Sequence, residues 1–486
     1  MRKTLPVFSC ALIGIFVFFA WRASGSSLPR ASTLTARVAW AADTFLQVST
    51  HDQVVCMPAV ADINRDDMPE IVFSSYQGQN YDSDGVLRAL RGDNGDEVFS
   101  VTDAALRVRP LSSPVLIDLE NDGDVEIVVE RSAGGLYAFD HLGALQYTSV
   151  PTFTLRAPQG SALAVADLDL DGYPEIVAGR YVLDHTLSHV VTLGAGNDTL
   201  LMSIVGDVNL DGSPDVIMAN TVYSGTGGVL HHNAALPALA SNALGNFDAD
   251  PYPEIVLVTP YGGGQVYLLD HQLQVVWGPA AVPGGGEPSG GPPTVADFDG
   301  DGFAEIGVSG ANAYTVFDAN GDVLMQRPGQ DLSSGFSVAS AFDLDGNGAA
   351  EVIYADETTF YIHDVLQPTD SFSTTHASIT GYEIPVVADV DADRQAEIVV
   401  AEADAFCHEY GCTPGFKGVR VFEAAGVPWA NVRRLWHQHA YDTTSVDDSL
   451  RIVSNPLPVW QSANTFRGQV APPGGGVKIY LPLCVR

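Results

Sequence analysis

The 486 residues carry a formal net charge of −36, yet only 17% of them are charged. Such an acidic surface repels phosphate backbones, so nucleic acid is excluded as an expected partner. The 48 Gly, 29 Pro and 46% hydrophobic residues favour many short strands joined by tight turns, within one large repeat architecture or several domains.

Residues 1–25 are typical of an export signal. Arg2 and Lys3 precede an apolar stretch from Leu5 to Trp21, and the small residues at 23–25 offer a cleavage site. An uncleaved membrane anchor is the alternative, because the stretch approaches the length that spans a bilayer. In either case we expect the rest of the chain to be secreted or at the extracellular cell surface. Residues 26–35 are predicted to be a linker, and no membrane span is expected in the mature chain.

An acidic loop recurs eight times between residues 36 and 430. The loops begin at residues 62, 118, 167, 207, 246, 297, 343 and 389, at intervals of 39 to 56 residues. A period of this size is typical of a four-stranded propeller blade. Short runs rich in Val and Ile flank the loops, as at 113–117 and 126–129, and such runs indicate strands. The sequence therefore predicts an all-β propeller with four-stranded blades, most simply eight of them.

The third loop, Asp167 to Glu175, shows the chemistry of the repeat most clearly. Carboxylates at its positions 1, 3, 5 and 9 converge if the chain curls, and Gly172 at position 6 permits a left-handed turn. The carbonyl at position 7 can add an oxygen, and we expect the apolar Leu168 and Leu170 to face the core. Several hard oxygen ligands on a flexible loop suit calcium better than zinc, copper or magnesium.

Asp and Gly also make ordinary turns, but eight copies with an acid or Asn at all four positions argue against turn formation alone. These 32 positions hold 28 of the 59 acids, and clustered carboxylates repel one another without a cation. We therefore expect several structural Ca²⁺ sites and no catalytic or other cofactor-binding residue. The predicted metal ligands are Asp62, Asn64, Asp66, Glu70, Asp118, Glu120, Asp122, Glu126, Asp167, Asp169, Asp171, Glu175, Asp207, Asn209, Asp211, Asp215, Asp248, Asp250, Glu254, Asp297, Asp299, Asp301, Glu305, Asp343, Asp345, Asn347, Glu351, Asp389, Asp391, Asp393 and Glu397.

The eight loops are unequal. The third and sixth combine four acids with Gly at position 6, and we expect them to bind most strongly. The first and eighth have Asp67 and Arg394 at that position, so weaker binding is expected there. The fifth opens with Asn246 and places Pro251 at position 6, where the fixed negative φ opposes a left-handed turn. We expect the fifth loop to be empty.

As a set, the loops resemble the FG-GAP or VCBS repeats of bacterial surface proteins and those of the integrin alpha-subunit propeller. The resemblance covers residues 36–430. It implies a calcium-stiffened propeller used for adhesion or ligand binding, with the metal in a structural role. The integrin propeller has seven blades, so seven is the alternative to eight. The implied partner is an unidentified protein or glycan at the cell surface.

The composition changes over residues 431–470. Trp436-His437-Gln438-His439-Ala440-Tyr441 and, further on, 464–469 (NTFRGQ) resemble a tail found in some bacterial FG-GAP proteins. His437 and His439 are candidate metal ligands or acid–base groups, but no third ligand stands nearby. Packing of the aromatic residues against the propeller is the favoured interpretation. Residues 471–486 are predicted to form a Pro/Gly linker and a terminal strand.

Four cysteines follow the predicted signal, and an oxidising compartment would allow them to pair. Cys407 and Cys412 could close a small loop, with Cys56 and Cys484 as a second pair, although all three pairings remain open. The tripeptide Arg91-Gly92-Asp93 matches an adhesive motif. It lies in a predicted hairpin, whose turn chemistry explains it without a receptor.

The favoured function is a secreted, non-enzymatic, calcium-binding adhesion or ligand-binding module. The alternative is an extracellular enzyme of the polysaccharide lyase type on an eight-bladed, calcium-containing propeller. Such an enzyme needs a base and a charge neutraliser in the central channel, yet only two lysines, Lys417 and Lys478, follow the signal. A quinoprotein dehydrogenase is a third and weaker hypothesis, because its acidic cofactor would also require basic residues.

Overall fold

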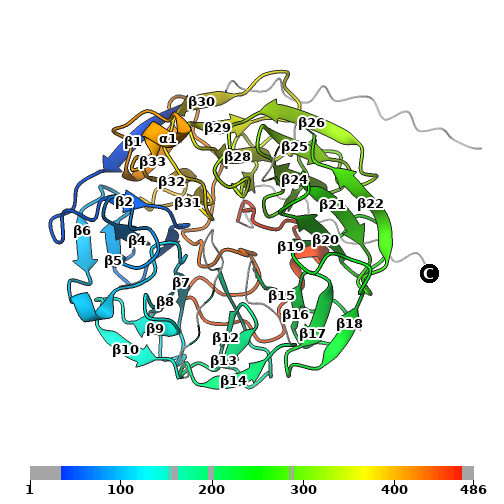
Figure 1. Cartoon of the computed structure of the whole chain (residues 1–486), viewed down its shortest axis with the longest axis horizontal. Coiled ribbons are helices and arrows are strands. Elements are labelled where there is room, and N and C mark those ends of the chain that lie inside the picture. The colour runs from blue at the N-terminus through cyan, green and yellow to red at the C-terminus, as the bar shows by residue number, and fades with distance from the viewer. Residues whose placement is uncertain are drawn as a thin grey trace, which may run out of the picture.

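A computed structural model describes residues 34–472 apart from 151–152, 154, 156–161, 195–201, 284–285 and 287–288. The predicted signal, most of the predicted linker and the predicted terminal strand lie outside these residues. The described chain forms eight antiparallel sheets that stand side by side around a ring (Figure 1). The prediction of an all-β propeller with eight four-stranded blades is therefore confirmed, and the seven-bladed alternative is wrong.

Seven of the blades take their strands in chain order from the centre of the ring outwards, whereas the eighth takes its outermost strand from the N-terminal end of the described chain. The first four blades are β2 (Gln53–Val54) and β3 (Ala59–Ala61) with β4 (Glu70–Tyr76), β5 (Val86–Arg91) and β6 (Glu97–Ser100); β7 (Val115–Ile117), β8 (Glu126–Glu130), β9 (Leu136–Phe139) and β10 (Leu145–Thr148); β11 (Leu163–Ala166), β12 (Glu175–Ala178), β13 (Tyr181–Leu183) and β14 (His189–Thr192); and β15 (Ile204–Gly206), β16 (Asp215–Met218), β17 (Thr221–Ser224) and β18 (Val229–His232).

The remaining blades follow the same plan, with short helical turns between some elements. They are β19 (Ser241–Gly245), β20 (Glu254–Thr259), β21 (Gln265–Leu269) and β22 (Val275–Ala281); β23 (Thr294–Ala296), β24 (Glu305–Ser309), β25 (Ala313–Phe317) and β26 (Val323–Pro328); β27 (Ser340–Phe342), β28 (Glu351–Ala355), β29 (Thr359–His363) and β30 (Phe372–Thr375); and β31 (Val386–Ala388), β32 (Glu397–Glu402), β33 (Gly418–Ala424) and β1 (Ala36–Ala42). The helical turns are η1 (Ala104–Leu106), α1 (Cys407–Tyr410) and η2 (Val459–Gln461).

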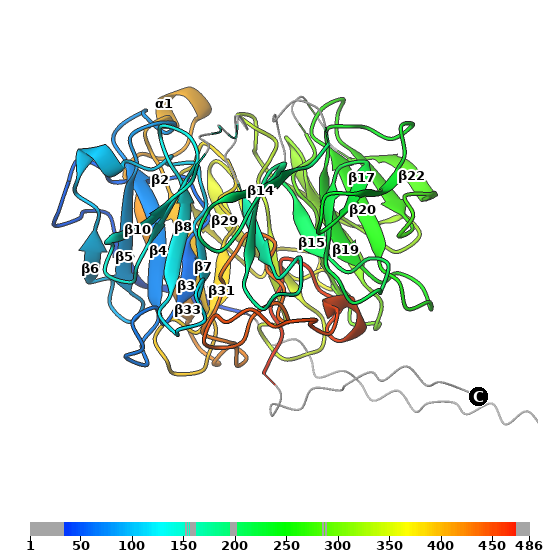
Figure 2. The same cartoon turned by 90° about the horizontal axis from the view of Figure 1, so that it is seen from below.

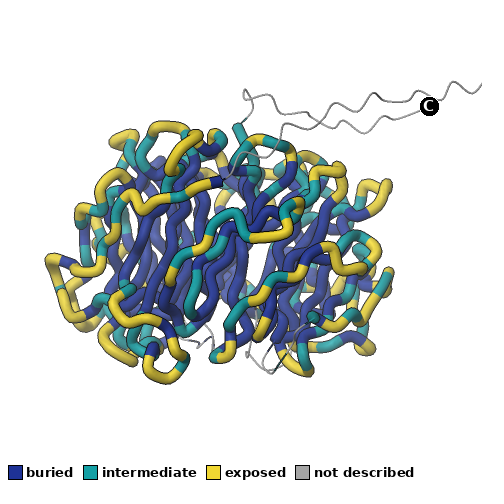
Figure 3. Tube along the Cα trace, turned by 90° about the horizontal axis from the view of Figure 1, so that it is seen from above, coloured by how far each residue is buried: buried dark blue, intermediate teal, exposed yellow. Residues whose placement is uncertain are grey.

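Burial falls from the inner strands to the outer ones (Figure 3). The second strand of the second blade, β8, is buried at every residue, whereas β10 at the outside is mostly exposed. Inner strands are covered by neighbouring blades on both faces, which explains why their sequences read as continuous Val and Ile runs without alternation.

The ring is closed by the N-terminal strand. β1 is the outermost strand of the eighth blade and pairs antiparallel with β33, from Ala36 opposite Ala424 to Ala42 opposite Val419. A β-bulge lies between Val38 and Trp40, and the Trp40 indole then donates a hydrogen bond of 2.8 Å to the Gly92 carbonyl of the first blade. The N-terminal segment that leads into the first blade is thus paired with the last blade, and the Trp40 side chain bonds to the first.

Residues 431–470 contain no regular strand and lie across one face of the ring (Figure 2). Trp436 is fully buried and stacks on Tyr441, with ring centroids 4.5 Å apart. The predicted packing of this segment against the propeller is what the structure shows.

The cysteine pairing is partly settled. Cys407 and Cys412 form a disulfide beside α1, and Cys56 is a buried free thiol whose pKa is raised by burial to about 11. Cys484 lies outside the described residues. Among the residues described, no helix is long and apolar enough to cross a membrane.

Candidate metal centres in the acidic loops

Every acidic loop joins the innermost strand of its blade to the second strand, so all eight lie at equivalent places around the ring. The acid at position 9 is in each case the first residue of that second strand. Its carboxylate accepts a hydrogen bond from the backbone N–H of position 2, at 2.7 to 3.2 Å, in all eight loops. This bond holds the position-9 carboxylate inside the curl of the loop.

Positions 2 and 4 have different surroundings. Every residue at position 2 is buried, from Ile63 in the first loop to Val390 in the eighth, and anchors its loop to the core. Position 4 instead adopts a left-handed backbone in seven loops. Leu170 has a φ of 63° and is 46% exposed, so the expectation that it faces the core with Leu168 is wrong.

The curl itself is built on positions 1 and 6. In seven loops the position-6 N–H donates to Oδ2 of the position-1 Asp, at 2.8 to 3.1 Å, and the position-6 residue has a positive φ. Asp67 and Arg394 adopt this left-handed conformation without being glycine, with φ of 68° and 79°. Their loops therefore have the same shape as the glycine-containing ones, at the expense of backbone strain.

The fifth loop lacks this arrangement. Pro251 has no N–H to donate, and the amide of Asn246 instead donates 2.8 Å to the Asp250 carbonyl. Neither Ala249 nor Pro251 has a positive φ. The loop nevertheless brings carboxylate oxygens of Asp248, Asp250 and Glu254 together, so its predicted vacancy stays a prediction.

Four loops gather three carboxylate oxygens within 4.8 Å of one another. They are the third (Asp167, Asp169, Glu175), the fifth (Asp248, Asp250, Glu254), the sixth (Asp297, Asp299, Asp301) and the eighth (Asp389, Asp391, Glu397). In the first, fourth and seventh loops an Asn takes one position, and amide oxygens are also calcium ligands. In the second, Glu120 accepts a hydrogen bond from the Tyr147 hydroxyl.

Two buried oxygens in these clusters are suited to coordinating a cation. Oδ1 of Asp167 and Oδ1 of Asp389 are buried and have no hydrogen-bond partner, although Oδ2 of each is bonded. An unpartnered buried carboxylate oxygen is costly, and a cation coordinated by the cluster would satisfy it. Because the donors in the four clusters are all oxygens, they suit Ca²⁺ rather than Zn²⁺.

Burial disfavours the ionised form of the clustered carboxylic acids when no cation is bound. Desolvation, together with the neighbouring carboxylates, raises the pKa of Glu175 and of Glu305 to about 8, and that of Glu397 to about 9. In the metal-free protein these groups hold protons at a pH where the unfolded chain has lost them. A bound dication favours the ionised carboxylates and so lowers their pKa values in the folded protein.

We expect metal-free protein to lose stability as pH rises from 5 to 9. The folded-state pKa values of Glu175, Glu305 and Glu397 exceed the ordinary 4.5, so their contribution is present below pH 4.5 and lost as pH rises to 8–9. Melting curves of metal-stripped protein across this range test the sign. A melting temperature that instead climbs over the same interval would contradict it, and added calcium should flatten the dependence.

The left-handed positions give a matched pair of substitutions. Gly302→Ala meets no atom within 4 Å of the new Cβ, so its cost, about 1–2 kcal/mol, comes from backbone strain at φ 95°. Arg394→Gly should stabilise the protein by up to about 1 kcal/mol, because strain relief exceeds the added unfolded-state entropy. Denaturant unfolding midpoints, recorded in the presence of calcium, measure the stability change of both variants. Equal shifts of the two midpoints in the same direction would refute the strain argument.

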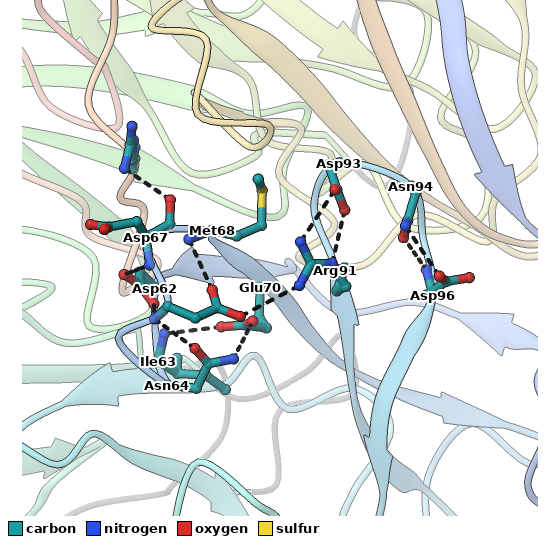
Figure 4. A network of polar contacts seen from close by, with 12 residues as sticks. Asp62, Ile63, Asn64, Asp67, Met68, Glu70, Arg91, Asp93, Asn94 and Asp96 are labelled. Carbon is teal, nitrogen blue, oxygen red and sulfur yellow. Dashed lines mark hydrogen bonds and ion pairs between the residues drawn. The ribbon is translucent and has the colours of Figure 1, made fainter.

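Figure 4 shows the first loop beside the hairpin that carries Arg91-Gly92-Asp93. The Arg91 guanidinium lies 3.1 Å from the Asp93 carboxylate and 3.4 Å from that of Asp66 in the loop. Arg91 and Asp93 thus bind each other at the β5–β6 turn, consistent with the turn explanation of the tripeptide.

His437 and His439 are fully buried and poorly suited to acid–base chemistry. Burial lowers the pKa of His437 to about 3 and that of His439 well below its usual value. Neutral His439 lies with Nε2 3.2 Å from the Ser203 carbonyl, to which it donates. Neither histidine joins a metal cluster within the described part of the chain.

Two basic residues at the loops were missed by sequence reasoning. Arg434 lies 3.3 Å from the Asp389 carboxylate, and Arg451 lies 3.2 Å from that of Asp118. Both pairs join position 1 of a loop to a residue more than 40 positions later in the chain, and no spacing rule points to them.

Comparison with known families supports the repeat. Residues 118–178 and 246–308, which include the second, third, fifth and sixth loops, match the FG-GAP-like repeat. The chain therefore carries FG-GAP-like repeats on a β-propeller. No curated protein matches the chain.

Solved structures share the fold at low sequence identity. The biofilm matrix protein Bap1 of V. cholerae superposes with a TM-score of 0.77 at 19% identity, covering 90% of this chain and 99% of that one. A rhamnogalacturonan lyase of Bacillus licheniformis gives 0.53 at 17%, covering 80% and 75%. A quinohemoprotein alcohol dehydrogenase of Pseudomonas putida HK5 gives 0.50 at 11%, covering 81% and 76%.

Proposed function

We propose that the chain is a secreted, calcium-binding propeller that acts as a non-enzymatic adhesion or ligand-binding module of an extracellular matrix. The observation that best supports this proposal is the acidic loop, which recurs in all eight blades. In each blade the same hydrogen bond holds the position-9 acid. The similarity to a biofilm matrix protein over nearly the whole of both chains supports the extracellular setting.

Calcium has a structural role in this proposal. The residues that would hold it are the acids and amides at positions 1, 3, 5 and 9, and the third and sixth loops combine four such acids with a glycine at position 6. Position 1 directly follows the innermost strand and position 9 opens the second, so one ion would tie the two strands of a blade together. When bound, calcium supplies positive charge that offsets the repulsion between the loop carboxylates.

Export is supported by the disulfide between Cys407 and Cys412, since disulfides persist mainly in oxidising compartments. The proposed mature chain begins after residue 25, and residues 36–430 are assigned to the propeller. We assign residues 431–470 to a C-terminal module that packs on it, followed by the segment 471–486.

The lyase-type alternative receives less support. The similarity to a rhamnogalacturonan lyase, at 17% identity, is a similarity of fold. The two module histidines are buried and neutral, and the Lys417 ammonium is 2.5 Å from Asp52. These basic groups are engaged in internal contacts rather than arranged as a base and a charge neutraliser.

A binding screen tests the proposed function. Purified protein is applied to a glycan array and to whole bacterial and host cell surfaces, with calcium and with EGTA. We expect saturable, calcium-dependent binding that the double variant D297N/D299N weakens. Absence of binding together with cleavage of an acidic polysaccharide, seen as new unsaturated ends absorbing in the ultraviolet, would favour the lyase instead.

A further inference from the structure

The segment after the eighth blade forms hydrogen bonds, blade by blade in chain order, with the innermost strand or with the residue directly beside it. Residues 436–439 bond to the first four blades, one residue to each blade. Trp436 exchanges two main-chain hydrogen bonds of 2.9 Å with Val60, and the His437 carbonyl accepts from Leu116 N–H at 3.0 Å. The Gln438 side chain accepts from Val165 N–H at 2.9 Å, and His439 donates to the Ser203 carbonyl.

Residues 464–469 bond in the same way to the fifth to eighth blades. The Asn464 side chain accepts from Asn246 N–H and donates to its carbonyl, at 2.8 and 2.7 Å. Phe466 pairs with Val295 through two main-chain bonds of 2.8 and 3.1 Å. Next, Ala341 N–H donates to the Arg467 carbonyl, and the Gln469 side chain donates 3.0 Å to the Val387 carbonyl of the eighth blade.

These contacts satisfy groups that a bare ring would leave unpaired. The innermost strand of each blade is an edge strand, and its free N–H and C=O groups at the centre need partners. Because one segment reaches all eight blades, its complete set of bonds exists only when the ring is closed.

Two arginines also fasten this segment to the acidic loops by equivalent contacts. Arg434 Nε is 3.3 Å from Oδ2 of Asp389, and its Nη2 is 3.3 Å from the Ala392 carbonyl. Arg451 Nε is 3.2 Å from Oδ2 of Asp118, and its Nη2 is 3.3 Å from the Asn121 carbonyl. In both loops the guanidinium thus binds the position-1 carboxylate and the position-4 carbonyl.

We propose that residues 431–469 form a plug that docks as a unit on the completed ring and is latched there by Arg434 and Arg451. The plug closes the centre of the ring on the face that carries the acidic loops, which we call the loop face. The plug is separable from the ring in sequence, since residues 425–428 before it form an exposed turn. A consequence is that an extracellular ligand contacts the outer rim or the opposite face rather than the centre of the loop face. This proposal does not depend on the metal.

The first test leaves the folding of the whole chain intact. A specific protease site is placed at the exposed turn around Val427, the folded protein is cut, and the products are passed over a gel-filtration column. We expect the C-terminal fragment to co-elute with the ring under native conditions and to separate only in denaturant. Separation under native conditions, with an unchanged melting temperature of the remaining ring, would overturn the proposal.

The second test addresses the latch. Hydrogen exchange of residues 442–463 is compared in the wild type, R434M, R451M and the double variant. Loss of both guanidinium groups should speed exchange in this stretch roughly tenfold or more, without a comparable change in β8 or β32. R37M is the matched control, because Arg37 forms a 2.8 Å ion pair with Glu423 on the outer strands. Exchange equal to the control would refute the latch.

Discussion

A chain that lacks residues 34–42 is expected to lose the cooperative unfolding of the ring. These residues supply β1, whose six pairs with β33 form the outer edge of the eighth blade. At about 1 kcal/mol net for each hydrogen bond, their loss removes on the order of 5 kcal/mol, comparable with the whole stability of many domains. The deletion also removes buried Leu34 and the Trp40 bond to the first blade.

The matched control begins at Leu34 and keeps β1 intact. Urea unfolding followed by circular dichroism should give one steep transition for the control and a shallow or early one for the deletion. If the two transitions coincide, the ring is held closed by other contacts and β1 is dispensable.

Removal of calcium is expected to have the second large effect. Four loops bring three carboxylates together, and a site held at 100-fold excess over its dissociation constant adds about 2.7 kcal/mol. Together such sites should raise the melting temperature by roughly 10 °C or more at neutral pH. Differential scanning calorimetry of calcium-loaded and EGTA-treated protein measures the difference.

Magnesium at the same concentration is the control, because it requires a stricter octahedral geometry and holds its water more tightly. It should restore only a small part of the lost stability. Full recovery with magnesium would contradict a calcium-specific site, while an unchanged melt after EGTA would contradict a structural metal altogether.

The repeated part of the fold could be predicted because it is local in sequence. The Gly at position 6, the spaced acids and the flanking apolar runs act within a dozen residues, and their count gave eight blades. The left-handed turn at position 6 was also predictable, including its absence at Pro251, whose ring fixes φ at a negative value. Leu170 was misplaced because alternation along an extended strand was applied to a residue with a left-handed backbone.

The contacts that complete the ring could not be predicted, because they join distant residues. β1 pairs with a strand more than 370 residues later, and Trp436 pairs with Val60 across a similar distance. Neither pairing has a periodic signal, since each occurs once. The aromatic and histidine residues of the plug indicated packing, but the order in which they meet the blades follows only from the closed ring.

Calcium content is the most direct test of the central claim that the acidic loops hold calcium. Protein is dialysed against micromolar calcium, washed, and measured by inductively coupled plasma mass spectrometry beside the variants D297N/D299N and D167N/D169N. The account predicts several tightly held calcium ions in each wild-type molecule and the loss of about one ion in each variant. Less than one ion in the wild type, or a content that neither variant changes, would contradict it.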